Sequence, residues 1–436
     1  MNFLQIIVSI IFLAIYFCLI IIKNKHKTYF IIPGIALLAI VITSLDPYFS
    51  VKDIIPFMLR EVNWNVIGIF AGTLILAEAF IFSKVPVLLS LKLIKISPNL
   101  GIAILLLSAI SSFISMFVEN VATVLILAPI AFELARRLEV SPVPFLISMA
   151  ICSNLQGTAT LIGDPPSMIL GAYAKINFND FFWYKGKPSI FFAIQIGAAF
   201  GFSVLYLFFH KYKKPIGELP SEPIRSWIPT ILLVIMILGL AVSSLFDPNF
   251  SWLGGTICIV MAAIGMLWMF FKDKEEFLDV KTKYDWDTTI FLMGIFIAVG
   301  FLEHTQIIDV IANWLKNITG GNLFISYTLI VWISVLLSAF IDNVPYITVM
   351  LPVAGKLGLS IGGEHAYVLL LFGLLIGSCI GGNITPLGAS ANVVAMGLLK
   401  KNGHTASSWE FIKLGLPFTA ASTAAGFIFL WLVWGH

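Results

Sequence analysis

Three carboxylates, Glu119, Asp164 and Asp342, lie inside long apolar stretches of the sequence. If these stretches cross a membrane, such carboxylates are expected to carry protons or bind a cation, because burying a charge in the bilayer costs free energy. It can also cap the half-helix that follows it, since its oxygens accept hydrogen bonds from the first free amides. For Asp164, which precedes Pro165, the two interpretations are equally favoured. For Glu119 and Asp342 the sequence favours coupling carboxylates.

Polar residues gather around these carboxylates in two segments that cannot form continuous helices. Residues 153–166 read SNLQGTATLIGDPP, and residues 378–392 read SCIGGNITPLGASAN. Glycines and prolines interrupt both segments, so each is predicted to be a broken helix whose free amides, hydroxyls and carbonyls bind a polar solute. The predicted substrate and ion site consists of Asn120, Thr123, Ser153, Asn154, Thr158, Thr160, Asn343, Ser378, Asn383, Thr385, Ser390 and Asn392. A Na⁺ site is expected at Asn120, Asn343, Thr158 and Asn383, and no other metal site is expected.

No lysine or arginine lies near these motifs in the sequence. A dianionic substrate would therefore meet carboxylates without a countercharge, so a neutral solute, a cation or a proton-coupled weak acid fits better. Cys152 and Cys379 flank the broken helices and would suit arsenite as soft ligands. Small buried core cysteines are the favoured interpretation of both.

The composition excludes a soluble protein. Of 436 residues, 59% are hydrophobic and only 11% are charged, whereas soluble domains average roughly 25% charged residues. The net charge of +3 gives no nucleic-acid footprint, and the sequence lacks HExxH, phosphate-loop and dinucleotide signatures. We expect an all-α polytopic membrane protein that is not an enzyme, needs no cofactor and uses a proton or sodium gradient.

Apolar runs of about 17–24 residues match the ~30 Å hydrocarbon core of a bilayer. They lie near residues 3–22, 29–45, 65–83, 188–210, 226–246, 252–271, 288–302 and 411–434. Stretches 101–135 and 323–355 each have a polar centre and one leg too short to cross, because twelve helical residues rise only ~18 Å. Both are predicted to be re-entrant hairpins, and stretches 143–173 and 366–398 are the two broken helices.

The sequence matches itself at a shift of about 223 residues. Asn63-Trp64-Asn65 falls on Asp285-Trp286-Asp287, and Glu119-Asn120-Val121 falls on Asp342-Asn343-Val344. Residues 1–213 are therefore the predicted first repeat, 214–225 a cytoplasmic linker and 226–436 an inverted second repeat. The prediction is about ten transmembrane helices and two opposed hairpins, the architecture of a transporter with a central site.

Basic residues set the expected orientation. With the loop at 23–28 in the cytoplasm, 19 of the 26 lysines and arginines lie on that side. This places both termini outside the cytoplasm, in the plasma or inner membrane.

The hairpin tip Glu119-Asn120-Val121 and residues 157–166 and 382–392 resemble the arsenite permease, NhaD antiporter and melanosomal P protein family. That family belongs to the ion transporter superfamily, which also holds citrate and sodium–dicarboxylate carriers. The resemblance implies a scaffold domain, a transport domain, elevator-type alternating access and a homodimer. It favours proton-coupled efflux of arsenite or antimonite, with Na⁺/H⁺ antiport and organic or inorganic anion transport as alternatives. A passive channel is the alternative from another class.

Overall fold

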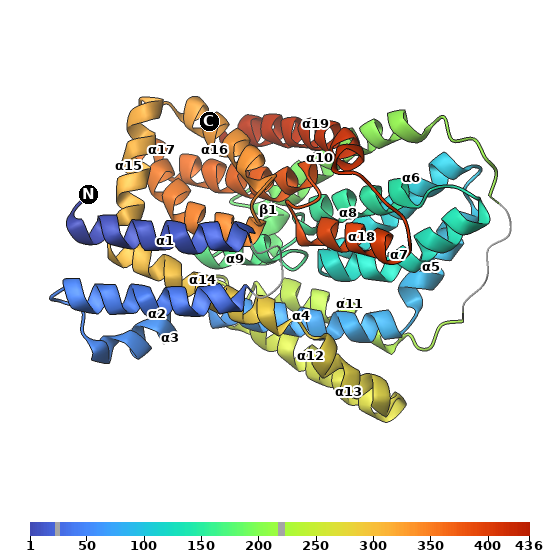
Figure 1. Cartoon of the computed structure of the whole chain (residues 1–436), viewed down its shortest axis with the longest axis horizontal. Coiled ribbons are helices and arrows are strands. Elements are labelled where there is room, and N and C mark those ends of the chain that lie inside the picture. The colour runs from blue at the N-terminus through green and yellow to red at the C-terminus, as the bar shows by residue number, and fades with distance from the viewer. Residues whose placement is uncertain (22–26, 217–222) are drawn as a thin grey trace.

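The computed structural model describes residues 1–21, 27–216 and 223–436, and helices make up nearly all of it (Figure 1). The first half contains α1 (Phe3–Ile21), α2 (Thr28–Leu45), α3 (Ile54–Glu61), α4 (Trp64–Phe82), α5 (Val85–Lys95), α6 (Leu100–Ser115), α7 (Asn120–Arg137), α8 (Val143–Gly157), α9 (Pro165–Ala174) and α10 (Ile190–Phe209). The second half contains α11 (Ile228–Ser243), α12 (Leu253–Lys272), α13 (Lys274–Lys283), α14 (Trp286–His304), α15 (Ile307–Thr319), α16 (Leu323–Ser338), α17 (Asn343–Gly381), α18 (Ser390–Lys401) and α19 (Ser408–Trp434).

The all-α prediction misses one small element. Strands β1 (Trp183–Tyr184) and β2 (Lys187–Pro188) pair antiparallel between α9 and α10. With two residues each they are too short to form a sheet layer. The fold is otherwise helical in the described ranges, with three short 3₁₀ turns at Val51–Asp53, Asn179–Phe181 and Gly382–Ile384.

Helices of the same kind recur in the same order in the two halves. Helices α4 and α14 begin at Trp64 and Trp286, and α6 and α16 begin at Leu100 and Leu323. Helices α5 and α15 occupy matching places just before the hairpins. This spacing agrees with the sequence shift of about 223 residues. The predicted linker 214–225 lies partly outside the described residues, because 217–222 are not among them.

A helix–turn–helix unit stands at each predicted hairpin. Helix α6 turns into α7 over residues 116–119, and α16 turns into α17 over residues 339–342. Figure 1 shows the first unit running inward from the side of α5, and the second running inward from the opposite side, beside α15. The two turns therefore approach each other near the middle of the molecule.

Both predicted breaks are also in place. Helix α8 ends at Gly157 and α9 begins at Pro165, while α17 ends at Gly381 and α18 begins at Ser390. Helix α17 is itself divided at Gly363, which has φ +69° and ψ −141°. Glycine adopts such angles at little cost because it has no Cβ. The division separates the hairpin leg from the half-helix that leads to the second break.

Residues 84–95 and 272–283 lie between the predicted apolar runs, and the sequence analysis assigned no helix to them. Helices α5 and α13 occupy these stretches. Their mixed polar and apolar sequences are shorter and less apolar than a span, which is why a search for apolar runs overlooked them. Helix α15 meets α16 at a bend of 117°.

Among the described residues, seven helices are long and apolar enough to cross a membrane, or eight if α15 and α16 form one bent span. Shorter apolar helices include Phe3–Cys18, Leu100–Ser115, Val143–Gly157 and Ile228–Ser243. The sequence predicted full spans at the first and last of these four.

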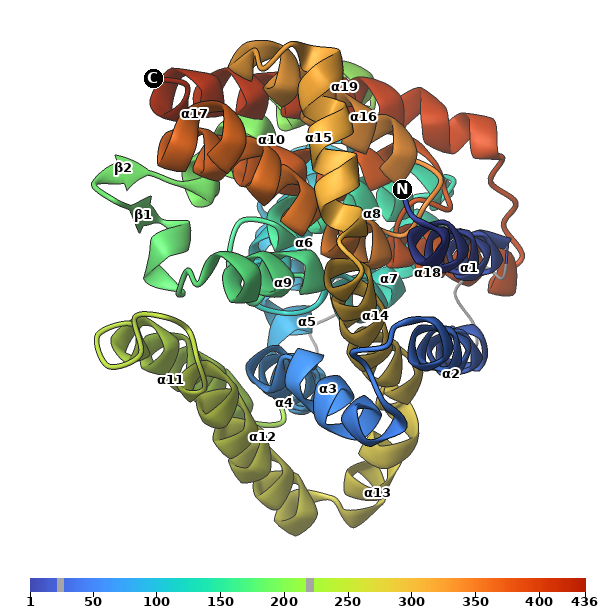
Figure 2. The same ribbon diagram turned by 90° about the vertical axis from the view of Figure 1, so that its left-hand side faces the viewer.

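Helices pair across the two halves as well as within them. Helix α12 packs along α4, α14 along α2, and α10 along α19. Figure 2 shows α11, α12 and α4 on one side of the molecule and α10, α17 and α19 on the other. Nearly all residues of helix α8 and of the second part of α17 are buried. The breaks that end these two helices therefore lie deep inside the protein.

Candidate functional site

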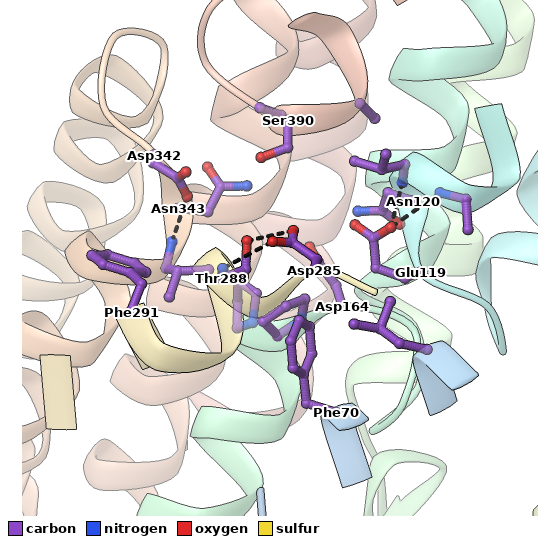
Figure 3. A pocket seen from close by; sticks show the side chains of 18 of the residues that line it. Phe70, Glu119, Asn120, Asp164, Asp285, Thr288, Phe291, Asp342, Asn343 and Ser390 are labelled. Carbon is purple, nitrogen blue, oxygen red and sulfur yellow. Dashed lines mark hydrogen bonds between the residues drawn. The ribbon is translucent and has the colours of Figure 1, made fainter. Parts of the chain in front are cut away.

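A cavity of about 150 Å³ lies where the two hairpin turns meet the two broken helices (Figure 3). A water molecule needs roughly 10–15 Å³ by this measure, so this central cavity has room for a small hydrated solute. The predicted site residues that line it are Glu119, Asn120, Asn154, Asp164, Asp342, Asn343 and Ser390. In Figure 3, Glu119 and Asp342 face the cavity from opposite sides.

Glu119 and Asp342 cap helices. The Glu119 carboxylate accepts hydrogen bonds from the backbone amides of Val121 and Ala122, at 2.8 and 3.0 Å. The Asp342 carboxylate accepts one from the amide of Val344, at 3.2 Å. The sequence ranked a coupling role above capping for both residues, and the structure shows that both carboxylates cap. Capping and ion binding are compatible, because a carboxylate has two oxygens and several lone pairs.

Asp164 differs from the other two carboxylates. It occupies the residue before α9, but its side chain makes no capping hydrogen bond. Its Oδ2 atom is buried and has no hydrogen-bond partner among the described residues. A buried acceptor without a partner costs about 1–3 kcal/mol, and more if it is charged. The structure therefore decides against capping for Asp164 and leaves a buried oxygen without a partner on a residue that lines the central cavity.

Asn154 joins the broken helix of the first half to that of the second. Its side-chain amide donates to Asn383 Oδ1 at 2.8 Å and to Asn392 Oδ1 at 2.9 Å. Asn383 in turn donates to the carbonyl of Ile151 at 3.0 Å. The Asn154 Oδ1 atom, like Asp164 Oδ2, is buried without a hydrogen-bond partner in the described part of the chain. Two unpartnered oxygens thus belong to residues that line the cavity.

The first hairpin turn is held against the first break by hydroxyl groups. Ser115 Oγ lies 2.5 Å from Asn120 Oδ1 and 2.9 Å from the Ser153 carbonyl oxygen, and its single proton can be donated to either. Thr160 donates to the carbonyl of Met116 in the turn.

The second turn repeats these contacts at matching positions. Ser338 Oγ lies 2.5 Å from Asn343 Oδ1 and also contacts the Ser378 carbonyl oxygen, and it can donate its single proton to either. Thr385 donates to the carbonyl of Ala339. The two turns are therefore built in the same way.

Glycines make the close approach of turn and break sterically feasible. A Cβ on Gly157 would lie 2.2 Å from Asn120 Oδ1, and one on Gly163 would lie 2.4 Å from the Gly157 carbonyl. In the second half, a Cβ on Gly382 would lie 2.7 Å from the Gly388 carbonyl. Contacts under 3.0 Å are essentially never seen for real Cβ atoms.

Most hydroxyls that the sequence assigned to solute binding donate to the protein itself. Thr158 donates to the Asn154 carbonyl at 3.1 Å, and Ser378 donates to the Leu375 carbonyl at 3.1 Å. Ser153 and Thr123 also donate to backbone carbonyls. A hydroxyl has one proton, so these side chains offer a solute only their acceptor lone pairs.

The four residues expected to bind Na⁺ do not all line the central cavity. Asn120 and Asn343 line the central cavity from opposite turns, while Thr158 and Asn383 are not among its lining residues. No group of three or more His, Cys, Asp or Glu side chains that suits a metal ion occurs in the described part of the chain. Cys152 and Cys379 are fully buried and are not among the lining residues, in agreement with core cysteines.

The sequence analysis missed two basic residues. Lys27 forms an ion pair with Asp342, and Lys283 also lines the cavity. The expectation that no lysine meets these carboxylates was therefore wrong. Lys27 and Asp342 are 315 positions apart, so no local sequence signal links them. The charged lining residues are Glu78, Glu119, Asp164, Asp285, Asp342, Lys27 and Lys283. With five acidic and two basic side chains, the cavity is acidic.

Comparison with known proteins identifies the family. A family model described as a citrate transporter, CitMHS, matches residues 16–377. The chain belongs to this citrate transporter family. Several relatives in the family comparison are bacterial. An uncharacterized transporter of Mycobacterium bovis is 30% identical over 448 residues that span 98% of each chain. A 46 kDa membrane protein of Mycobacterium leprae is 29% identical over 98% of each chain.

Two further similarities extend beyond these relatives. The mouse P protein is 24% identical over 75% of this chain, and the alignment spans 48% of the P protein. The Alcanivorax borkumensis YdaH transporter has the same fold, with a TM-score of 0.61 at 14% identity over 94% of this chain and 98% of that one. The chain is thus a multi-pass membrane transporter of the citrate transporter family and not an enzyme.

Proposed function

We propose that this transporter exchanges protons for a small cation, such as Na⁺ or Li⁺, at the central cavity. The unpartnered Oδ2 of Asp164 is the observation that carries the proposal. A buried carboxylate of a residue that lines a cavity suits either a proton or a hard cation, and the same group can hold the two in turn. Competition of this kind is the simplest way to couple proton movement to cation movement.

The donors and acceptors of the cavity support a cation. Asp164 and Asn154 each contribute a buried oxygen without a partner. Oxygen ligands of this type suit hard cations, and carbonyls of unwound helices commonly complete such sites in transporters. The net acidic lining attracts a cation in the same way.

Arsenite efflux, which the sequence favoured, has less support. As(OH)₃ needs both donors and acceptors, but most hydroxyl and amide groups of the predicted substrate site already donate to backbone carbonyls or to one another. Thr158, Thr160 and Thr385 are examples. Arsenite is therefore a comparison substrate in the test below.

Citrate enters as a second comparison substrate because of the family description. Lys27 and Lys283 offer positive charge at the cavity, but Lys27 pairs with Asp342 and Lys283 with Glu276. Free citrate would thus meet an acidic lining whose lysines are already engaged.

The architecture supports an alternating-access mechanism for this exchange. We place α1–α4 and α11–α14 in a scaffold, and α6–α10 and α16–α19 in a transport body that moves past it as an elevator. The central cavity has lining residues from both groups, such as Phe70 and Phe291 from the first and Asn120 and Asn343 from the second. We further propose inverted repeats, both termini outside the cytoplasm of the plasma or inner membrane, and a homodimer.

The test uses purified protein in liposomes with an imposed pH gradient and a pH-sensitive dye. NaCl and LiCl are expected to dissipate the gradient, whereas choline chloride, potassium arsenite and potassium citrate are not. Asp164→Asn is expected to abolish the response, because it deletes the charge and keeps the shape. Asp309→Asn is the matched control, since Asp309 lies outside the cavity and pairs with Lys356. Dissipation by arsenite or citrate without any response to Na⁺ or Li⁺ would refute the proposal.

A further inference from the structure

The ion pair between Lys27 and Asp342 joins the proposed scaffold to the second hairpin turn of the proposed transport body. The backbone of Lys27 is tied to α14, because its amide donates to Asp287 Oδ2 at 3.1 Å and the amide of Thr28 donates to Oδ1 at 3.2 Å. The Lys27 ammonium lies 5.2 Å from the ring centre of Phe291 and contacts Asp342 on the second hairpin turn. The backbone of Lys27 is therefore attached to the proposed scaffold, whereas its ammonium group contacts the proposed transport body.

The two hairpin turns differ at this point although they match elsewhere. Glu119 and Asp342 occupy equivalent places and both cap the following helix. Of these two carboxylates, only Asp342 has an ion-pair partner among the described residues. Its Oδ1 accepts the amide of Val344, and its Oδ2 accepts the lysine. The second turn therefore has an oxygen that faces the cavity and is already occupied by a cation of the protein itself.

We propose that Lys27 is a tethered competitor of the transported cation. Its ammonium occupies, on Asp342 Oδ2, a position that the incoming cation takes during transport, and the cation must displace it. The proposal rests on the cation exchange proposed above and names the residue that regulates binding at the same site. At equal distance two monovalent cations interact equally with a carboxylate, so displacement replaces one ion pair by another.

This competition would explain how the empty protein tolerates Asp342. A buried ion pair that loses one partner leaves an uncompensated charge, which is strongly unfavourable. The Lys27 side chain is 10% exposed and the Asp342 side chain 21% exposed, so water compensates little. With Lys27 in place, Asp342 of the empty protein belongs to a neutral ion pair. When a cation binds Asp342, the Lys27 ammonium leaves the carboxylate while the Lys27 backbone stays attached to the scaffold. The second hairpin turn is then free to move.

The experiment measures cation binding through the thermal unfolding midpoint of purified protein in detergent, because a ligand of the folded state stabilises it. NaCl is titrated against choline chloride at constant ionic strength. In Lys27→Met the half-saturating Na⁺ concentration is expected to fall at least tenfold, because the competitor is gone. Lys27→Arg is expected to keep the wild-type value. Lys356→Met is the matched control, because Lys356 also forms a lysine–aspartate ion pair, with Asp309 at 2.7 Å. Neither of these two residues lines the cavity.

Removal of the carboxylate gives the second part of the test. In Lys27→Met with Asp342→Asn, the gain in apparent affinity is expected to disappear. If Lys27→Met does not fold, Lys27→Gln carries the same expectation, since it keeps a polar contact with Asp342 and deletes the charge.

The outcomes separate the two proposals. A wild-type response to Na⁺ with an unchanged half-saturating concentration in Lys27→Met overturns the competition and leaves the cation proposal standing. No response to Na⁺ or Li⁺ in either protein refutes the proposed function, and the competition falls with it.

Discussion

Replacement of Asn154 by leucine tests the contact that joins the two broken helices. The Asn154 amide donates to Asn383 Oδ1 and Asn392 Oδ1, at 2.8 and 2.9 Å. Leucine has a similar volume but no donor, so both acceptors would stay buried without this hydrogen bond. Each loss costs about 1–3 kcal/mol, but leucine also removes the buried Asn154 Oδ1 that has no partner, so the free energy of unfolding is predicted to decrease by about 1–3 kcal/mol. The measurement is an SDS titration of purified protein in mixed micelles.

Asn65→Leu is the matched control. Asn65 is also a buried asparagine with two long-range hydrogen bonds, since it donates to the Phe250 carbonyl at 2.9 Å and accepts from the Gly255 amide of α12 at 2.6 Å. It lies outside the central cavity. Both variants are expected to lose stability, but only Asn154→Leu is expected to lose cation-driven pH dissipation per folded molecule. An unfolding free energy for Asn154→Leu within ~0.5 kcal/mol of wild type would show that the bridge is not made.

Three further predictions concern the turns, a loop and the topology. Gly157→Ala places a Cβ 2.2 Å from a side-chain oxygen of the first hairpin turn, so it should destabilise by about 1–3 kcal/mol, whereas Gly397→Ala, with nothing within 4 Å, should not. Partial burial of Asp247 raises its pKa, but hydrogen bonds from three backbone amides of the following turn outweigh burial and hold the pKa below its ordinary value. Its stabilising contribution is therefore present at neutral pH and is lost as the pH falls through that lowered pKa, so Asp247→Asn should flatten the acid limb of a stability–pH curve below about pH 4. Cysteines at Lys92 and Arg136 should react with an impermeant maleimide from the same side of the membrane, and labelling from opposite sides would rule out the first hairpin.

The hairpin turns and helix breaks were predictable because their signals are local. Polar pairs such as Asp342-Asn343 and breakers such as Pro165 stand out within apolar sequence, and each acts on the backbone within a few residues. The match between the two halves added an independent check on their positions.

The roles of individual side chains were less predictable. Whether Asp164 or Glu119 caps a helix depends on whether the carboxylate turns back towards the amides, and both precede a helix in the sequence. The Lys27–Asp342 pair depends on how the first loop packs against a turn more than 300 residues later. Such long-range placement follows from the complete fold, and no local pattern encodes it.

The pairing of α2 with α14 has a consequence for biosynthesis. Helix α2 ends at Leu45, and its partner does not begin until Trp286. At a synthesis rate of about 5–20 residues per second, α2 waits roughly 12–50 s in the bilayer before α14 leaves the ribosome. Its apolar sequence suits that interval, since lipid can cover the face that α14 later takes. The first half of this chain is therefore made as an incomplete intermediate, and insertion into the membrane precedes assembly of the native helix pairs.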